Sequence, residues 1–225
     1  IDGDAFGACW GVTSFNVAEG NATFSSIDGV LFNVDKYELR LYPIGKTDES
    51  YTVPAGVKDI MGDAFYGAGN LKQLIMPEGV SRVYAQAIRE MGNLETIDFP
   101  STLTELNTGT FYGCKKLKTI IIRATEVPYY GGTDLSSSSF DNTVLYVPEA
   151  SLEAYKADSD FGALAANGRN NIKSIGVLTG IDNIASEDAI EVARYDITGR
   201  QLKSAAKGIN IVKYSDGSIK KVLVK

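Results

Sequence analysis

Apolar residues recur at a fixed interval between Pro54 and Arg123. Three segments begin at a proline, and their starts at Pro54, Pro77 and Pro100 are 23 residues apart without gaps. The same columns are apolar in every segment: Val57/Val80/Leu103, Ile60/Val83/Leu106, Phe65/Ile88/Phe111 and Leu71/Leu94/Leu117. Because one segment is too short to bury these side chains alone, we expect the segments to stack and share a continuous core.

Each segment ends in a short alternation of apolar and polar residues. The apolar members are Leu74 and Met76, Ile97 and Phe99, and Ile120 and Ile122. A period of two predicts a strand with one buried face. A repeat of 20 to 29 residues is typical of leucine-rich-repeat solenoids. The pattern therefore predicts a β-rich solenoid of the leucine-rich-repeat type with a 23-residue period.

The period changes toward the N-terminus. Residues 1–17 align with 60–76 at an offset of 59, so they are expected to form the back half of a repeat in a trimmed, longer parent chain. Residues 18–49 interrupt the period, and alternation on both sides of a turn at 35–36 predicts a hairpin insert at about 21–49. The hairpin either covers an edge or contributes to binding. The segment 50–53 restores the repeat strand.

The C-terminal part contains weaker signals. Residues 124–142 are rich in Gly, Ser and Thr and predict a loop, after which Leu145 and Val147 predict one more strand. Residues 149–158 predict a short helix that closes the stack. We therefore expect a solenoid at 1–158, a connector at 159–180 and a small β unit at 181–225, with turns at Thr198–Gly199 and Asp216–Gly217.

Composition and charge exclude several classes of function. The formal net charge is −6, but the segment from Arg194 to Lys225 carries +6 and the rest of the chain −12. An acidic solenoid is repelled by phosphate, so no nucleic-acid partner is expected. No apolar run approaches the ~20 residues of a membrane-spanning helix. The chain has no histidine, which removes Ser-His-Asp and Cys-His nucleophilic machinery and imidazole metal sites.

The repeat also places the two cysteines. Cys9 and Cys114 both align with the column of Ala68, four strand spacings apart. At ~4.8 Å per spacing they are ~19 Å apart, whereas a disulfide requires Cα atoms within about 7 Å. We predict two free, buried thiols.

The repeat VPAGVKDIMGDAFYGAGNLKQLIMP resembles the BspA-like leucine-rich repeats of surface proteins of Bacteroidetes and other microbes. The insert SIDGVLFNVDKYELRLYP and the closing LYVPEASLEAYKAD resemble segments of the same family, so that the resemblance covers roughly residues 1–158. The tail RYDITGRQL…KGINIVKYSDGSIKKVLVK is similar to the C-terminal sorting domain of type IX secretion. These resemblances imply a secreted protein, or one at the outer face of the outer membrane, and adhesion to host proteins.

Strand alternation predicts which side chains point away from the core. The first of them are Ser14, Asn16, Ser50 and Thr52. The binding candidates that follow are Gln73, Ile75, Thr96, Asp98, Thr119, Ile121, Val144 and Tyr146. Together these rows make a surface ~24 Å long, polar at its start and apolar toward its end. The apolar members either form a contact surface or are covered by the tail or the 124–142 loop.

A second candidate is the pair Tyr129–Tyr130 beside Gly131–Gly132. These rings either stack on a sugar or anchor a protein partner, or they fold back on the core. The acids Glu78, Glu90 and Glu105 are scattered turn residues, and nothing in the sequence brings two of them into one pocket.

We therefore predict a non-enzymatic extracellular or cell-surface module for protein binding or adhesion, without a cofactor or metal. Its partner would be a protein or glycan on a host or neighbouring cell. The alternatives are a glycan-binding module and a structural segment of a larger surface protein.

Overall fold

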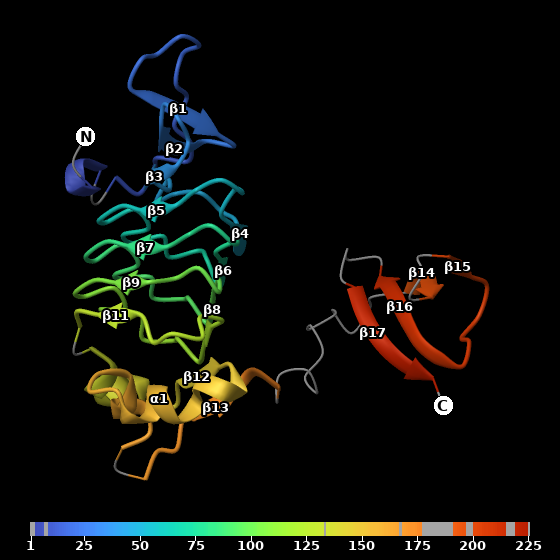
Figure 1. The fold of residues 1–225 in the computed structure, drawn as a ribbon. Helices are drawn as coiled ribbons and strands as arrows, with labels where there is room; N and C mark the ends of the chain where they lie inside the picture. Colours follow the sequence, from blue (N-terminus) through green and yellow to red (C-terminus); the bar gives the residue numbers. More distant parts are fainter. Residues whose placement is uncertain are drawn as a thin grey trace. The chain divides into compact units, whose positions relative to one another are not determined.

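The computed structural model describes residues 3–6, 9–132, 134–166, 168–176, 191–196, 200–214 and 219–224. The chain divides into two compact units, Ile1–Ile175 and Gly176–Lys225. Each unit is described by itself (Figure 1).

Unit 1 is a solenoid with two sheets, which we call sheet A and sheet B. Sheet A has the order β1-β2-β3-β5-β7-β9-β11, and sheet B the order β13-β12-β10-β8-β6-β4. The strands of sheet A are β1 (Phe24–Ile27), β2 (Val30–Asn33), β3 (Glu38–Leu41), β5 (Asp59–Ile60), β7 (Arg82–Val83), β9 (Glu105–Leu106) and β11 (Tyr129–Tyr130). The strands of sheet B are β4 (Ser50–Thr52), β6 (Gln73–Ile75), β8 (Thr96–Phe99), β10 (Thr119–Ile122), β12 (Val144–Val147) and β13 (Ile172–Ser174).

Each 23-residue repeat contributes one strand to each sheet. The repeat strands pair in parallel with a shift of one period, so that Asp59 lies opposite Arg82 in sheet A and Leu74 opposite Ile97 in sheet B. The solenoid and the sheet B strands confirm the predicted fold class. The sequence analysis missed sheet A, because its repeat strands of two residues are too short to show an alternation of period two.

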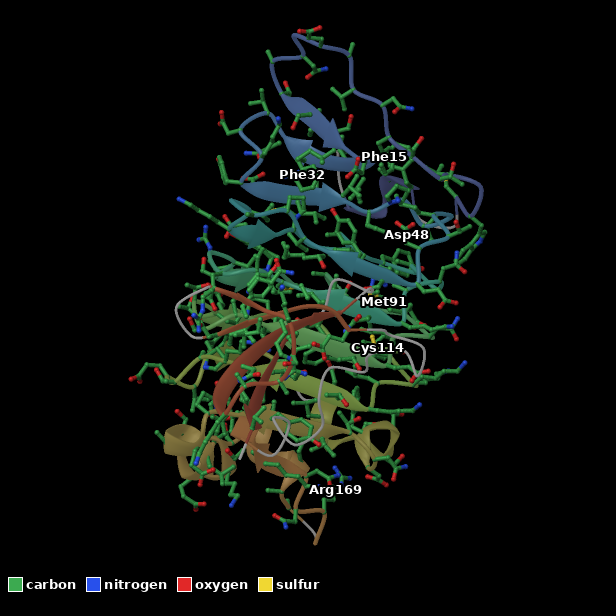
Figure 2. All side chains as sticks on the ribbon, turned by 90° about the vertical axis from the view of Figure 1, so that its right-hand side faces the viewer. Phe15, Phe32, Asp48, Met91, Cys114 and Arg169 are labelled. Atoms are coloured by element: carbon green, nitrogen blue, oxygen red, sulfur yellow. The ribbon has the colours of Figure 1, made fainter. Side chains whose placement is uncertain are left out.

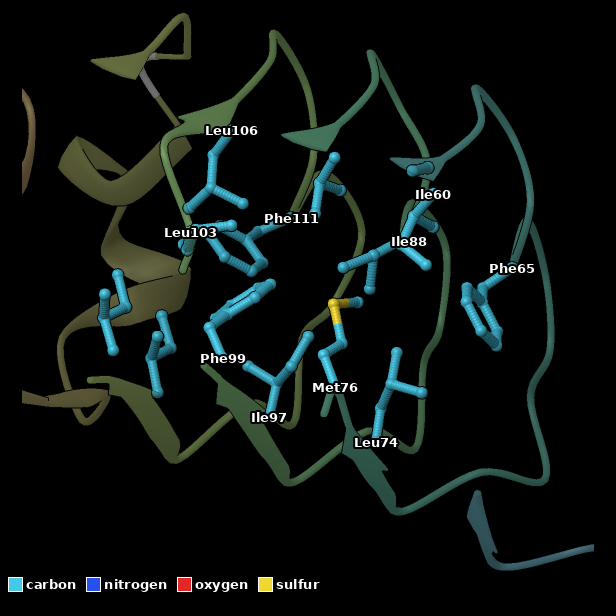
Figure 3. Close-up of a cluster of buried hydrophobic side chains, with 14 of the residues drawn as sticks. Ile60, Phe65, Leu74, Met76, Ile88, Ile97, Phe99, Leu103, Leu106 and Phe111 are labelled. Atoms are coloured by element: carbon cyan, nitrogen blue, oxygen red, sulfur yellow. The ribbon is translucent and has the colours of Figure 1, made fainter. Parts of the chain in front are cut away.

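The core lies between the two sheets. Leu74 and Ile97 point inward from sheet B, and Ile60 and Leu106 point toward them from sheet A (Figure 3). All four are fully buried. The apolar columns of the sequence thus form continuous rows along the stack, as predicted.

The predicted hairpin is present at the N-terminal end of sheet A. β2 and β3 pair antiparallel, and β3 then pairs in parallel with β5, so the hairpin continues the sheet. A further strand, β1, was not predicted. It is joined to β2 through a tight turn in which Asp28 and Gly29 have positive φ values of 49° and 80°.

The prediction that residues 1–17 add a repeat strand is wrong for its described part. Sheet B begins at β4, and the segment around Ser14 and Asn16 forms no strand. Phe15 instead donates its backbone N–H to Gly29 O at 2.7 Å. The alignment of this segment failed because the hairpin, rather than a preceding repeat, supplies its hydrogen-bond partners.

The C-terminal end of unit 1 is more regular than predicted. The expected loop at 124–142 contains β11 and two 3₁₀ turns, Asp134–Ser136 and Ser138–Phe140. A 3₁₀ turn at Glu149–Ser151 leads into α1 (Leu152–Ala157), where the capping helix was predicted. The expected connector contains the 3₁₀ turn Phe161–Leu164 and β13, which pairs in parallel with β12. The compact unit therefore extends to residue 175, beyond the predicted boundary at 158.

Unit 2 contains a small antiparallel sheet with the order β15-β14-β16-β17. Its strands are β14 (Glu191–Asp196), β15 (Gln201–Leu202), β16 (Gly208–Tyr214) and β17 (Ile219–Val224). A small β unit was predicted here. Both predicted turns, at 198–199 and 216–217, lie outside the described residues.

Both cysteines are free, as predicted, but their environments differ. Cys114 is buried in its repeat column, and burial raises the pKa of its thiol to about 12. The prediction of a buried Cys9 is wrong, because the N-terminal segment does not stack as a repeat and leaves this residue exposed.

These environments predict selective thiol labelling. In the folded protein at pH 8, Ellman's reagent should react rapidly with Cys9 alone, because the Cys114 thiol is shielded and protonated. Both thiols should react in denaturant. The Cys9→Ser variant should show no rapid reaction, and two rapidly reacting thiols in the native wild type would contradict the described core.

The shared core predicts a large stability difference between two neighbouring residues. Phe111 is fully buried, with ring centroids 6.2 Å from Phe99 and 6.0 Å from Tyr130, whereas Tyr112 is 61% exposed. Phe111→Ala should lower the free energy of unfolding by about 3–5 kcal/mol because it leaves a cavity. Tyr112→Ala should change it by less than about 0.5 kcal/mol. Urea unfolding followed by circular dichroism measures both, and equal midpoints for the two variants would refute this assignment of the core.

Candidate functional site: the outer face of sheet B

The candidate surface is the outward face of sheet B, which we call the sheet B face. It comprises Gln73, Ile75, Thr96, Asp98, Thr119, Ile121, Val144 and Tyr146. These residues alternate with fully buried ones such as Leu74, Ile97 and Ile120, which fix the strands on the core. The rows predicted for β4 to β12 are therefore present, with neighbouring members about 4.8 Å apart along the stack, but the predicted first members Ser14 and Asn16 lie outside sheet B.

The register sorts the sheet B face into two rows. One row runs from Gln73 through Thr96 and Thr119 to Val144 and is mostly polar. The other row places Asp98 between Ile75 and Ile121 and ends in Tyr146. Apolar groups thus lie on both sides of one carboxylate.

An ion pair neutralises this central carboxylate. Arg123 follows β10 and binds both oxygens of Asp98, with Nε–Oδ1 and Nη2–Oδ2 distances of 2.9 and 2.7 Å. The hydrogen bonds and charge of Asp98 raise the pKa of Arg123 above its usual value. The sheet B face therefore presents apolar groups next to a carboxylate that already has a partner.

Exposure along the sheet B face is graded. Gln73 is exposed, and its side-chain oxygen accepts a hydrogen bond from Ser50 Oγ at 3.1 Å. The members from Ile75 to Val144 are partly buried. Tyr146 is only 9% exposed, so its ring offers little surface to a partner. The usable apolar surface therefore consists of Ile75, Ile121 and Val144.

The structure separates the two tyrosines of the second candidate. Tyr129 is 63% exposed, whereas Tyr130 is buried and stacks on Phe161 with a centroid distance of 5.3 Å. Burial and the nearby carboxylate of Asp134, to which its hydroxyl is hydrogen bonded at 3.1 Å, raise the pKa of Tyr130. A binding role for Tyr130 is therefore corrected to a core role. The two rings separate because Tyr129 and Tyr130 are neighbours in a strand and point to opposite sides.

The carboxylates considered for catalysis lie on different sides of the solenoid. Glu78 accepts hydrogen bonds from Ser101 in the loops that lead from sheet B to sheet A. Glu105 lies in β9 on sheet A, and Glu90 in a loop that leads from sheet A to sheet B. A cavity near Phe15 and Tyr42 has a volume of about 10 Å³, enough for roughly one water molecule. Nothing in the described residues brings a catalytic pair together.

Within the described ranges, no group of three or more Cys, Asp or Glu side chains is placed to hold a metal ion. In the same part of the chain, no helix is both long and apolar enough to cross a membrane.

The sequence analysis missed exposed rings outside the sheets. Trp10 and Tyr112 are 64% and 61% exposed, and both lie in loop segments. Tyr112 shares a repeat column with Tyr66 and Arg89, and this column of large polar-tipped residues was the signal that could have found it.

Comparison with known proteins agrees with this geometry. Residues 46–154 match the family described as the BspA type leucine rich repeat region, in six copies. No curated protein matches the chain.

Two solved structures are similar to this one. A leucine rich cell surface protein from Faecalibacterium prausnitzii A2-165 is 27% identical with a TM-score of 0.55, and the match covers 76% of this chain and 44% of that one. A leucine-rich repeat protein from Eubacterium ventriosum ATCC 27560 is 28% identical with a TM-score of 0.52, over 61% of this chain and 37% of that one. The chain thus spans less than half the length of either protein. From the stacked parallel strands, the 23-residue period and these matches, we conclude that the chain is a leucine-rich-repeat protein whose residues 46–154 are similar to repeats of the BspA type.

Proposed function

We propose that unit 1 is a non-enzymatic module for protein binding or adhesion, and that the sheet B face contacts the partner. The observation that carries this proposal is the mixed surface around Asp98, where the partly exposed Ile75 and Ile121 flank a carboxylate that is already paired. Protein interfaces combine such apolar groups with polar groups whose hydrogen bonds are satisfied.

The rigidity of the sheet supports the same proposal. Each strand of the sheet B face is paired with its neighbours and anchored by buried side chains, so the surface changes little when a partner binds. A surface that is ordered before binding loses little conformational entropy on association. The leucine rich cell surface protein from F. prausnitzii, to which the chain is similar, supports a location on or outside the cell.

The glycan-binding alternative has less support on this part of the molecule. It depended on adjacent tyrosines at 129–130, and only Tyr129 is exposed. From the resemblance of the tail to a type IX sorting domain, we propose that the protein is exported to the outer face of the outer membrane. The resemblance of the repeats also leads us to propose a Bacteroidetes origin. The four-stranded antiparallel sheet of unit 2 supports the tail assignment.

The proposal predicts which substitutions weaken binding. The double variant Ile75→Thr and Ile121→Thr keeps a β-branched residue in each strand but removes apolar contact area. It should weaken binding by about tenfold or more, because each lost aliphatic group contributes roughly 1 kcal/mol at an interface. Surface plasmon resonance on purified extracellular-matrix proteins, next to a glycan array, measures the effect.

Val34→Thr is the matched control. Val34 is an exposed apolar residue after β2, away from sheet B, and its replacement should leave binding unchanged. Equal binding by the double variant and the wild type would exclude the sheet B face. Binding only on the glycan array would favour a glycan-binding module. No binding to either the matrix proteins or the glycan array would favour a structural segment of a larger surface protein.

A further inference from the structure

The loops that lead from sheet A to sheet B carry a row of large side chains outside the core. Tyr66, Arg89 and Tyr112 occupy one repeat column. Backbone hydrogen bonds join their loops, because the Gly67 N–H donates to Arg89 O at 3.2 Å and the Glu90 N–H donates to Tyr112 O at 2.7 Å. Figure 2 shows Met91 and Cys114, from the same loops, one above the other along this side of the stack. We call Trp10, Tyr66, Arg89, Glu90 and Tyr112 the aromatic flank.

Trp10 lies at one end of the aromatic flank. It packs over Gly67, where an added Cβ would lie 3.5 Å from the indole Cζ3 and 2.8 Å from Ile44 Cδ1. Gly67 also has a φ of +67°, which favours glycine. The position thus leaves room for the indole, which stays 64% exposed. Trp10 is the single tryptophan of the chain.

The middle of the aromatic flank holds a cation on an aromatic ring. The Arg89 guanidinium lies over the Tyr66 ring at 4.0 Å, and its Nε donates to Asp63 Oδ1 at 2.6 Å. The side chain therefore has both a ring and a carboxylate as partners. This arrangement shows what a basic side chain finds on this side of the solenoid: a tyrosine face next to an acid.

One repeat further, the same column holds Tyr112, and Glu90 lies in the neighbouring column of Gly67 and Gly113. Tyr112 is 61% exposed, and its carbonyl oxygen accepts a hydrogen bond from the Glu90 backbone N–H at 2.7 Å. The Glu90 carboxylate lies over the next residue, Gly113, where an added Cβ would be 2.5–2.8 Å from the carboxylate atoms. No lysine or arginine of the described residues forms an ion pair with the exposed Glu90.

We propose that Glu90 and Tyr112 bind a lysine or arginine side chain of a partner protein, with Trp10 as a second contact on the same flank. Elsewhere on the flank, Arg89 already holds a cation against the Tyr66 ring and the Asp63 carboxylate, which shows that a cation is stable with these two kinds of partner here. Tryptophan, tyrosine and arginine are the residues that most often dominate protein interfaces. The net charge of −12 on the chain before Arg194 attracts a basic partner at long range. This surface is separate from the sheet B face and does not depend on the function proposed for that face.

Fluorescein-labelled Gly-Ser peptides that carry three arginines, or three citrullines of the same shape without charge, test the proposal. We expect the arginine peptide to raise the fluorescence anisotropy in a saturable manner and to shift the Trp10 emission. The citrulline peptide should bind at least about threefold more weakly, and sodium chloride should weaken the binding of the arginine peptide. The substitutions Glu90→Gln and Tyr112→Ala should each weaken the binding of the arginine peptide by about threefold or more.

Tyr129→Ala is the matched control, because Tyr129 is a tyrosine of almost equal exposure on sheet A. It should bind the arginine peptide like the wild type, and so should the Ile75→Thr, Ile121→Thr double variant, so that failure of this proposal is distinguishable from failure of the sheet B face. Equal binding of both peptides, or full binding by Glu90→Gln and Tyr112→Ala, would overturn the proposal. Displacement of the peptide by a neutral oligosaccharide would also overturn it and would assign the flank to glycans.

Discussion

The parallel register with a shift of 23 residues is the constraint on which the solenoid depends. From β4 to β10 in sheet B and from β5 to β9 in sheet A, each strand pairs with the same position of the next repeat, for example Asp59 with Arg82 and Leu74 with Ile97. A slip of one residue would turn each buried side chain outward. Because the columns are apolar and buried in every repeat, the hydrophobic effect and the hydrogen bonds select the same register.

This register also creates the surfaces. Whatever residue type a column carries outside the core becomes a row about 4.8 Å per step along the solenoid. On the sheet B face the row of Ile75, Asp98 and Ile121 places apolar groups around a paired carboxylate. In the loops, one column contains Tyr66, Arg89 and Tyr112. The Arg89 guanidinium lies over the Tyr66 ring, and Tyr112 follows one repeat later as an exposed ring. Both candidate surfaces thus follow from the repetition, and neither is a pocket.

The two ends of the repeat array are closed in different ways. At the N-terminal end of sheet A, the antiparallel strands β1 to β3 continue the parallel sheet. At the other end, β13 adds a strand to sheet B, and Tyr155 of α1 is fully buried, with its hydroxyl donating to Ala124 O at 3.0 Å. Repeat arrays need such caps, since a terminal repeat otherwise exposes its apolar columns to water.

The sequence by itself determined the repeat, the buried columns, the outward rows of sheet B and the hairpin, because all of these depend on residues close together or at one fixed spacing. It also predicted that Cys9 and Cys114 are free, which is correct, although the repeat alignment of Cys9 behind this prediction is wrong. Only the tertiary structure decided where Trp10 and Cys9 lie, that Tyr130 is buried while Tyr129 is exposed, that β13 extends sheet B, and that the Glu90 carboxylate rests over Gly113. The physical reason is that these outcomes depend on packing between segments whose separation follows no period, or on which of several repeats supplies a partner. The sequence shows which residues share a repeat column, but it does not show which of them already have a partner in the folded chain.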